Sequence, residues 1–207
     1  ANPKRGQRGP QHNGPKGQPA GLNERCHAIV IFLNNNHPMN ASHPTIHVLF
    51  LCTHNSARSI LAEALLNHLG QGRFKAHSAG SSPRPQQQPN PMAIEALKHA
   101  GIATEGLYSK SWDEFAKPDA PVMDLVITVC DSAAGEACPY WPGHPAKAHW
   151  GYADPSAIEG TDDAKREAFA QTLIALQRRL SHLVQLPPDA LTPSQLEQTA
   201  KALAKGD

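Results

Sequence analysis

The chain has 207 residues, of which 40% are hydrophobic, and a formal net charge of +1. This length suits one core with a segment to spare, and no apolar stretch approaches the roughly 18 residues of a membrane span. The near-neutral charge gives no broad electrostatic footprint for a nucleic acid, so we expect neither a nucleic acid nor a membrane as partner. Four cysteines are too few for a secreted disulfide framework, which favours a cytoplasmic location.

The first 44 residues differ in composition from the rest. They are rich in Pro, Gly, Asn and Gln, carry five Lys/Arg against one acid, and lack a periodic apolar pattern. Such a segment cannot bury enough apolar surface to fold, so we expect residues 1–44 to be a disordered basic tail. Met39 stands just before the first strong strand, and residues 1–38 are interpreted as an upstream extension. No role is predicted for Cys26 within it.

From Thr45 onward, strand patterns alternate with helix patterns. In chain order we expect a strand over 46–52, a helix over 59–69, a strand over 74–79, a helix begun by Asn90-Pro91, a strand over 125–129, a short strand over 148–150, a helix from about Thr161 to Pro187, and a helix from the Thr192 capping box to about Ala204. This alternation predicts an α/β domain over 45–186, with a parallel sheet flanked by helices, followed by an appendage over 187–207.

The junction of the first strand and the first helix carries the strongest chemical signal. Cys52 ends the strand, and Arg58 and Ser59 open the helix. Backbone N–H groups and the positive end of a helix dipole meet at such a point, where anions bind and thiols ionise. We expect Cys52 to be a nucleophile, Ser59 to donate to its thiolate, and an oxyanion to be bound by Thr53, His54, Asn55, Ser56, Ala57 and Arg58. A buried cysteine at a strand end is the alternative.

Two further segments belong with this loop. Asp154-Pro155 lies in a turn where a carboxylic acid could protonate a leaving oxygen. Cys130 and Cys138 are separated by small and flexible residues, so the segment can bend until the two sulfurs meet and relay a disulfide. Strand ends of a parallel sheet share one edge, so Cys130 is expected near Cys52. A zinc site made by these two thiols and His149 is the competing interpretation.

Six motifs together resemble the arsenate reductases of the low-molecular-weight protein tyrosine phosphatase fold, over about residues 45–185. They are Val48 to Ser59, Ser78-Ala79-Gly80, Asn90-Pro91, Ser109-Lys110-Ser111-Trp112, the Cys130/Cys138 segment, and His149-Trp150-Gly151 leading to Asp154-Pro155. The resemblance implies a single domain with a four-stranded parallel sheet and a cytoplasmic enzyme that detoxifies arsenate by reducing it to arsenite.

The resemblance also implies roles for single residues. Cys52 would attack arsenate held by the loop and Arg58, while Asp154 protonates the departing oxygen. Cys130 would then attack Cys52, and Cys138 would attack Cys130 and carry the disulfide outward. Thioredoxin is the first expected reductant, and glutaredoxin with glutathione the second. We expect a monomer with no bound cofactor. Some relatives bind a potassium ion, and Asn55, Glu63, Ser78 and Asp113 are similar to that site.

Departures from the family leave alternatives open. His54 stands where many relatives have Gly, and Ala57 where many have a second cysteine. His54 either helps to keep Cys52 ionised or simply faces solvent. A phosphotyrosine phosphatase is the main alternative function, although Ser156 replaces the tyrosine that phosphatases often carry after Asp-Pro. A non-enzymatic sensor that binds trivalent arsenic through three thiols is the second alternative.

Overall fold

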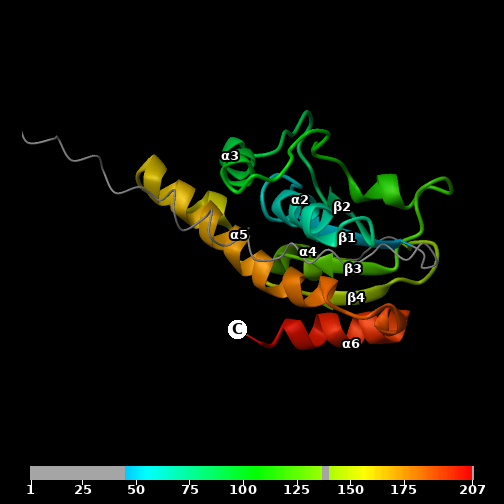
Figure 1. Ribbon diagram of the computed structural model, residues 1–207. Coiled ribbons are helices and arrows are strands. Elements are labelled where there is room, and N and C mark those ends of the chain that lie inside the picture. The colour runs from blue at the N-terminus through cyan, green and yellow to red at the C-terminus, as the bar shows by residue number, and fades with distance from the viewer. Residues whose placement is uncertain (1–44, 137–139, 207) are drawn as a thin grey trace, which may run out of the picture.

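The computed structural model of the protein describes residues 45–136 and 140–206, and the predictions for the first 44 residues and for Cys138 lie outside them. Its centre is a sheet of four strands, β1 (Ile46–Cys52), β2 (Phe74–Gly80), β3 (Leu125–Thr128) and β4 (Ala146–His149). All pairings are parallel, and the strand order is β2-β1-β3-β4. The predicted four-stranded parallel sheet is therefore confirmed (Figure 1).

Five α-helices follow the strands in the described part of the chain: α2 (Arg58–Gly70), α3 (Pro91–His99), α4 (Asp131–Ala134), α5 (Asp162–Val184) and α6 (Pro193–Leu203). Their starts follow local chemistry. Asn90 accepts a hydrogen bond from the Met92 N–H at 2.9 Å, and the Thr161 side chain caps α5 in the same way at Ala164. The Asn90 cap and the start of α5 near Thr161 were predicted from the sequence.

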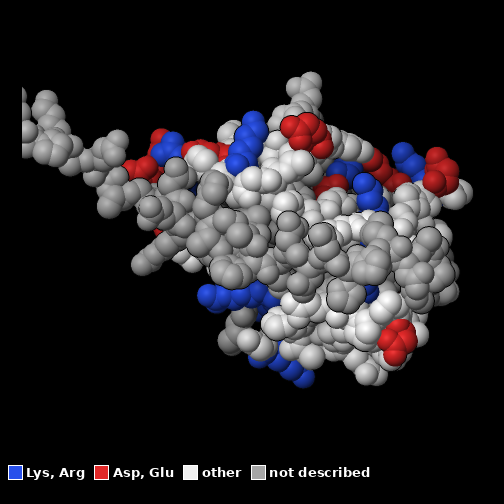
Figure 2. Space-filling view, in the orientation of Figure 1, with Lys and Arg blue, Asp and Glu red and all other residues white. Residues whose placement is uncertain are grey.

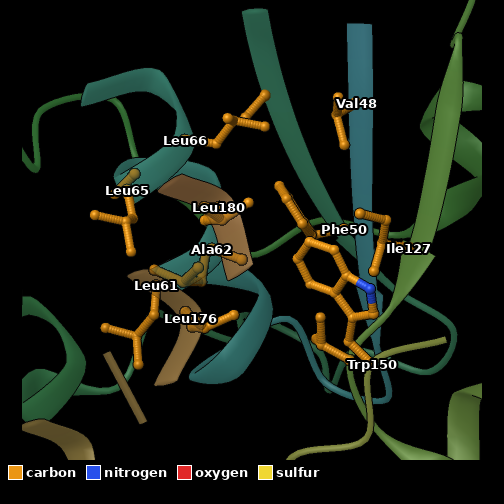
Figure 3. Close-up of a cluster of buried hydrophobic side chains, with 14 of the residues drawn as sticks. Val48, Phe50, Leu61, Ala62, Leu65, Leu66, Ile127, Trp150, Leu176 and Leu180 are labelled. Atoms are coloured by element: carbon orange, nitrogen blue, oxygen red, sulfur yellow. The ribbon is translucent and has the colours of Figure 1, made fainter. Parts of the chain in front are cut away.

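The main core fills the space between the sheet and helices α2 and α5. Figure 3 shows Phe50 and Ile127 of the sheet and Trp150, just beyond β4, facing Leu61 and Ala62 of α2. On the other face of β1, Leu49 and Leu51 pack in a second, smaller cluster with Trp112 and Trp141. Burial on both faces explains why 46–52 reads as a nearly continuous apolar run.

The C-terminal helix α6 packs against the edge strand β4 (Figure 1). Leu196 and Ala200 are fully buried in the main core, and the Trp150 indole N–H donates to the Ala200 carbonyl at 2.8 Å. The predicted capping box does not form, because the Thr192 hydroxyl bonds the Gln195 side chain and caps no backbone N–H. A buried tryptophan needs a partner for its N–H, and α6 supplies it.

Charged side chains of both signs are interspersed over the described surface in Figure 2. Among the helices of the described ranges, none is long and apolar enough to cross a membrane.

Two histidines on the neighbouring strands β1 and β2 contact each other. His47 Nδ1 lies 3.1 Å from His77 Nε2, and the two rings stack. The edge of the Phe115 ring packs on His77. Burial lowers the pKa of His77 to about 4, with smaller contributions from His47, Lys75 and Lys110.

We expect the free energy of unfolding to fall as the pH drops from about 6.5 to 4. In that pH range His77 binds a proton in the unfolded chain but stays neutral in the native state, so the native state is destabilised by about 1–2 kcal/mol. Urea unfolding of His77→Gln at pH 7 and pH 4.5 should show a smaller loss than the parent chain. The exposed His68→Gln serves as the matched control, and an equal loss in both variants would contradict the assignment.

Candidate active site

The Cys52 sulfur is held at the end of β1 by the loop that follows it. It lies 3.2 Å from the Asn55 backbone N–H, which donates to it, and 3.0 Å from the Ser59 hydroxyl. Cys52 is 3% exposed and free of any disulfide. The sulfur thus contacts a backbone N–H and a hydroxyl at the strand-to-helix junction where the sequence places the candidate nucleophile.

Asn55 organises this loop through its buried side-chain amide. Its oxygen accepts from the Lys110 backbone N–H at 2.8 Å, which fixes the orientation of the amide. Its nitrogen then donates to Ser59 at 2.9 Å and to Ser78 at 2.8 Å. Asn55 has a φ of 51°, a left-handed conformation that asparagine tolerates better than most residues.

A cavity of about 240 Å³ opens over the sulfur, and it contains most of the predicted anion-binding residues. Its lining is Cys52, Thr53, His54, Ser56, Ala57, Arg58, Ser132, Asp154 and Ser156. The N-cap of α2 is Ala57, which makes no side-chain hydrogen bond to the first turn. The first N–H groups of α2 are therefore available to an anion, which would serve as the missing cap.

Arg58 and Asp154 meet across this cavity. Arg58 Nη2 donates to Asp154 Oδ2 at 2.8 Å, and Nη1 donates to the Tyr152 carbonyl at 2.9 Å. The second carboxylate oxygen of Asp154 accepts from the backbone N–H and the hydroxyl of Ser156. The predicted cation and the predicted acid are thus adjacent, and both face the nucleophile loop.

Cys130 lies two residues beyond the end of β3, at the N-cap of α4 and at the same edge of the sheet as Cys52. It is 2% exposed, and its sulfur accepts from the Ala133 N–H at 3.4 Å and lies 3.6 Å from the Thr53 hydroxyl. Thr53 follows Cys52 directly, so the second buried thiol lies against the nucleophile loop, as predicted. Pairing of β3 with β1 brings the two together, since the Val129 N–H donates to the Leu51 carbonyl at 2.7 Å.

His149, the third member of the alternative zinc site, contacts two other side chains through its ring nitrogens. Its Nδ1 lies 2.8 Å from the Thr128 hydroxyl, and its Nε2 lies 3.0 Å from Asp131 Oδ1. Within the described residues no group of three His, Cys, Asp or Glu side chains could hold a metal ion. The interactions of His149 instead tie β4 to the start of α4.

His54 turns away from the nucleophile. Its Nδ1 lies 2.9 Å from the Ser82 carbonyl, so this nitrogen carries the hydrogen and donates it. In addition, the Ser82 N–H donates to the Thr53 carbonyl at 2.8 Å. These bonds fasten the loop to the segment after β2 and leave His54 at the rim of the cavity.

The predicted potassium site is not supported by the structure. Asn55, Glu63 and Ser78 do come together, but Asn55 donates an N–H to Ser78, and the ammonium of Lys110 lies 3.6 Å from Glu63 Oε2. Asp113 instead accepts from the Ser111 hydroxyl on an exposed turn. Donors and a second cation stand where a potassium ion needs oxygen lone pairs, so the residues do not fit the ion.

Gly80 and Lys110 stand in motifs identified from the sequence, but sequence reasoning gave neither a role. A Cβ on Gly80 would lie 2.7 Å from the Thr53 carbonyl oxygen and 3.1 Å from the Asn55 nitrogen. The nucleophile loop therefore passes directly over the end of β2. A glycine at the end of a strand pattern is the signal for such a close approach.

We expect Gly80→Ala to displace the loop while leaving the fold intact, because the clash is with backbone atoms that position Cys52. Affinity for inorganic phosphate should fall by a factor of at least ten, measured by calorimetry. Gly206→Ala is the matched control, because the atom nearest to an added Cβ there is the Ala202 carbonyl oxygen at 4.0 Å. Unchanged phosphate binding in Gly80→Ala would show that the loop tolerates the shift.

Comparison with known proteins agrees with this geometry. The sequence profile of a family described as low molecular weight phosphotyrosine protein phosphatase matches residues 47–199. An arsenate reductase of Bacillus subtilis (strain 168) is 33% identical over 138 residues, covering 67% of this chain and 94% of that protein. The structure of an arsenate reductase in the phosphate binding state is 26% identical, with a TM-score of 0.52, and covers 68% of this chain and 97% of the other.

The arsenate reductase structure from Archaeoglobus fulgidus is 28% identical, with a TM-score of 0.51, and covers 67% of this chain and 99% of the other. The family match over residues 47–199 includes the strands and helices that build the cavity around Cys52. The chain belongs to the low molecular weight phosphotyrosine protein phosphatase family.

Proposed function

We propose that this protein reduces arsenate to arsenite through a relay of three cysteines, Cys52, Cys130 and Cys138. The observation that carries the proposal is the second buried thiol, Cys130, lying against the nucleophile loop at Thr53. Hydrolysis of an ester has no use for a thiol at this place. The relatives named arsenate reductase support the same reaction class.

The first step is the attack of the Cys52 thiolate on arsenic. The tetrahedral oxyanion enters the cavity, where the N–H groups at the start of α2 and the Arg58 guanidinium hold its oxygens. A sulfur–arsenic bond forms while one arsenic–oxygen bond breaks. Asp154, at the rim of the same cavity, supplies the proton with which that oxygen leaves as water.

The second step is the attack of the Cys130 thiolate on the Cys52 sulfur. The sulfur–arsenic electron pair stays with arsenic, which passes from the pentavalent to the trivalent state and leaves as arsenite. The two sulfurs are oxidised to a Cys52–Cys130 disulfide. Cys138 then attacks Cys130, frees Cys52 as a thiolate and leaves a Cys130–Cys138 disulfide.

A dithiol reductant closes the cycle by reducing that last disulfide. We assign this role to a thioredoxin-like protein, with glutaredoxin and glutathione as the second choice, because exchange with a dithiol returns both thiols in one encounter. A reducing cytoplasm provides such a partner. The protein would serve arsenic detoxification there.

Phosphatase activity is the second candidate, and it is favoured by the set of Cys52, Arg58 and Asp154. These residues suffice to form and release a phosphorylated cysteine without Cys130. A passive arsenic sensor fits less well, since it leaves the Arg58–Asp154 pair without a function.

We expect Cys130→Ser to lose arsenate-dependent NADPH oxidation in the presence of thioredoxin and thioredoxin reductase. The loss should exceed a factor of one hundred, because a hydroxyl cannot resolve the sulfur–arsenic adduct. Any hydrolysis of p-nitrophenyl phosphate by the same variant should persist within about threefold, since that reaction needs only Cys52, Arg58 and Asp154.

Two controls complete this experiment. Cys52→Ser should abolish both activities, and Cys26→Ser should change neither. Steady turnover of arsenate by Cys130→Ser would refute the relay, whereas loss of both activities in that variant would indicate structural damage at the sheet edge.

A further inference from the structure

A continuous set of hydrogen bonds leads from the Cys52 sulfur to a buried ion pair. Asn55 donates to the hydroxyls of Ser59 and Ser78, so each hydroxyl is left with its own hydrogen to donate. Ser59 can give its hydrogen to Cys52, and Ser78 gives its hydrogen to Glu63 at 2.5 Å. This polarity places an acceptor at each end, the Cys52 sulfur and a Glu63 carboxyl oxygen.

Keeping the buried Glu63 side chain ionised costs free energy unless a cation lies beside it. Burial raises the pKa of Glu63, and the nearby Lys110 charge opposes that rise. A protonated Glu63 could direct a hydrogen at Ser78 and leave the Ser78 hydrogen without an acceptor. An ionised Glu63 accepts the Ser78 hydrogen and leaves the Ser78 oxygen to accept from Asn55, which supports the hydrogen-bond direction that leads to Cys52.

Lys110 is built into this position. Its side chain is 5% exposed, and that of Glu63 is 12% exposed. The ammonium lies 3.6 Å from Glu63 Oε2, donates to the Tyr108 carbonyl at 3.1 Å and stands 4.2 Å from the centre of the Tyr108 ring. A carboxylate, a carbonyl and an aromatic face are ligands that suit a monovalent cation.

We propose that the Lys110 ammonium is the fixed internal cation of the nucleophile loop, holding Glu63 as the carboxylate that orients Ser78, Asn55 and Ser59, so that anion binding needs no dissolved cation. Lys110 is thus a positioning residue. The inference goes beyond the proposed function, since it holds for any oxyanion that the loop binds.

Two parts of Lys110 have separate roles, and a substitution separates them. Its backbone N–H orients the Asn55 amide, whereas its ammonium neutralises Glu63. Lys110→Ala keeps the backbone contact, removes the charge and leaves room for a small cation beside Glu63. Potassium and ammonium ions can enter that space, while choline is too large.

Binding of inorganic phosphate, measured as protection of Cys52 from iodoacetamide and read by mass spectrometry of its peptide, tests the proposal without any reduction step. The parent chain should bind phosphate equally in choline, potassium and ammonium chloride at one ionic strength. Lys110→Ala should bind about tenfold more weakly in choline and recover to within about threefold in potassium or ammonium.

Two further variants show whether the response comes from Glu63. The double variant Glu63→Gln with Lys110→Ala should not respond to potassium, because the carboxylate that attracts the ion is gone. Lys98→Ala, an exposed lysine on α3, should behave as the parent chain in all three salts.

The proposal is overturned if Lys110→Ala binds phosphate normally in choline, or if neither small cation improves weakened binding. Should Lys110→Ala unfold in choline, its urea midpoint must rise in potassium, and an unchanged midpoint would also overturn the proposal. If the parent chain shows normal phosphate protection of Cys52 but does not reduce arsenate, that result counts against the proposed function and not against the role of Lys110.

Discussion

The side-chain amide of Asn55 is the contact on which the rest of the site depends. It is fully buried, its oxygen is fixed by the Lys110 N–H, and both hydrogens of its nitrogen go to serine hydroxyls. Those hydroxyls must pass their own hydrogens outward, to a sulfur on one side and a carboxylate on the other. The same contact therefore sets the shape of the loop and the direction of the hydrogen bonds toward the group at each end.

The parallel sheet gives this loop its second thiol. Strands β1 and β3 run side by side and end together, so residues far apart in sequence meet at one edge. Cys52 ends one strand and Cys130 follows the other, with the Cys130 sulfur 3.6 Å from the hydroxyl of Thr53, the residue next to Cys52. An antiparallel neighbour would have ended at the opposite side of the sheet. The topology thus makes a nucleophile with a resolving thiol possible without a long excursion of the chain.

Local patterns predicted most of the fold, and tertiary contacts decided what they missed. The apolar run of β1 and the Asn90 cap can each be recognised from a few consecutive residues. Burial of the Lys110 ammonium against Glu63 cannot be recognised in this way, because a lysine in a polar turn usually stays in water. The four residues predicted to hold potassium were an approximation to this site. Three of them, Asn55, Glu63 and Ser78, do lie together, but the sequence could not show that the Lys110 side chain supplies the cation there.

The Arg58–Asp154 pair couples anion binding to acid chemistry. The Arg58 side chain is 14% exposed. One of its terminal nitrogens donates to Asp154 and the other to the Tyr152 carbonyl. An oxyanion over Cys52 competes with Asp154 for the same guanidinium, and a doubly charged anion flanked by helix N–H groups is the stronger competitor. Arrival of the anion would therefore draw Arg58 from Asp154 and free that carboxyl oxygen at the rim of the cavity, where the proposed reaction needs an acid.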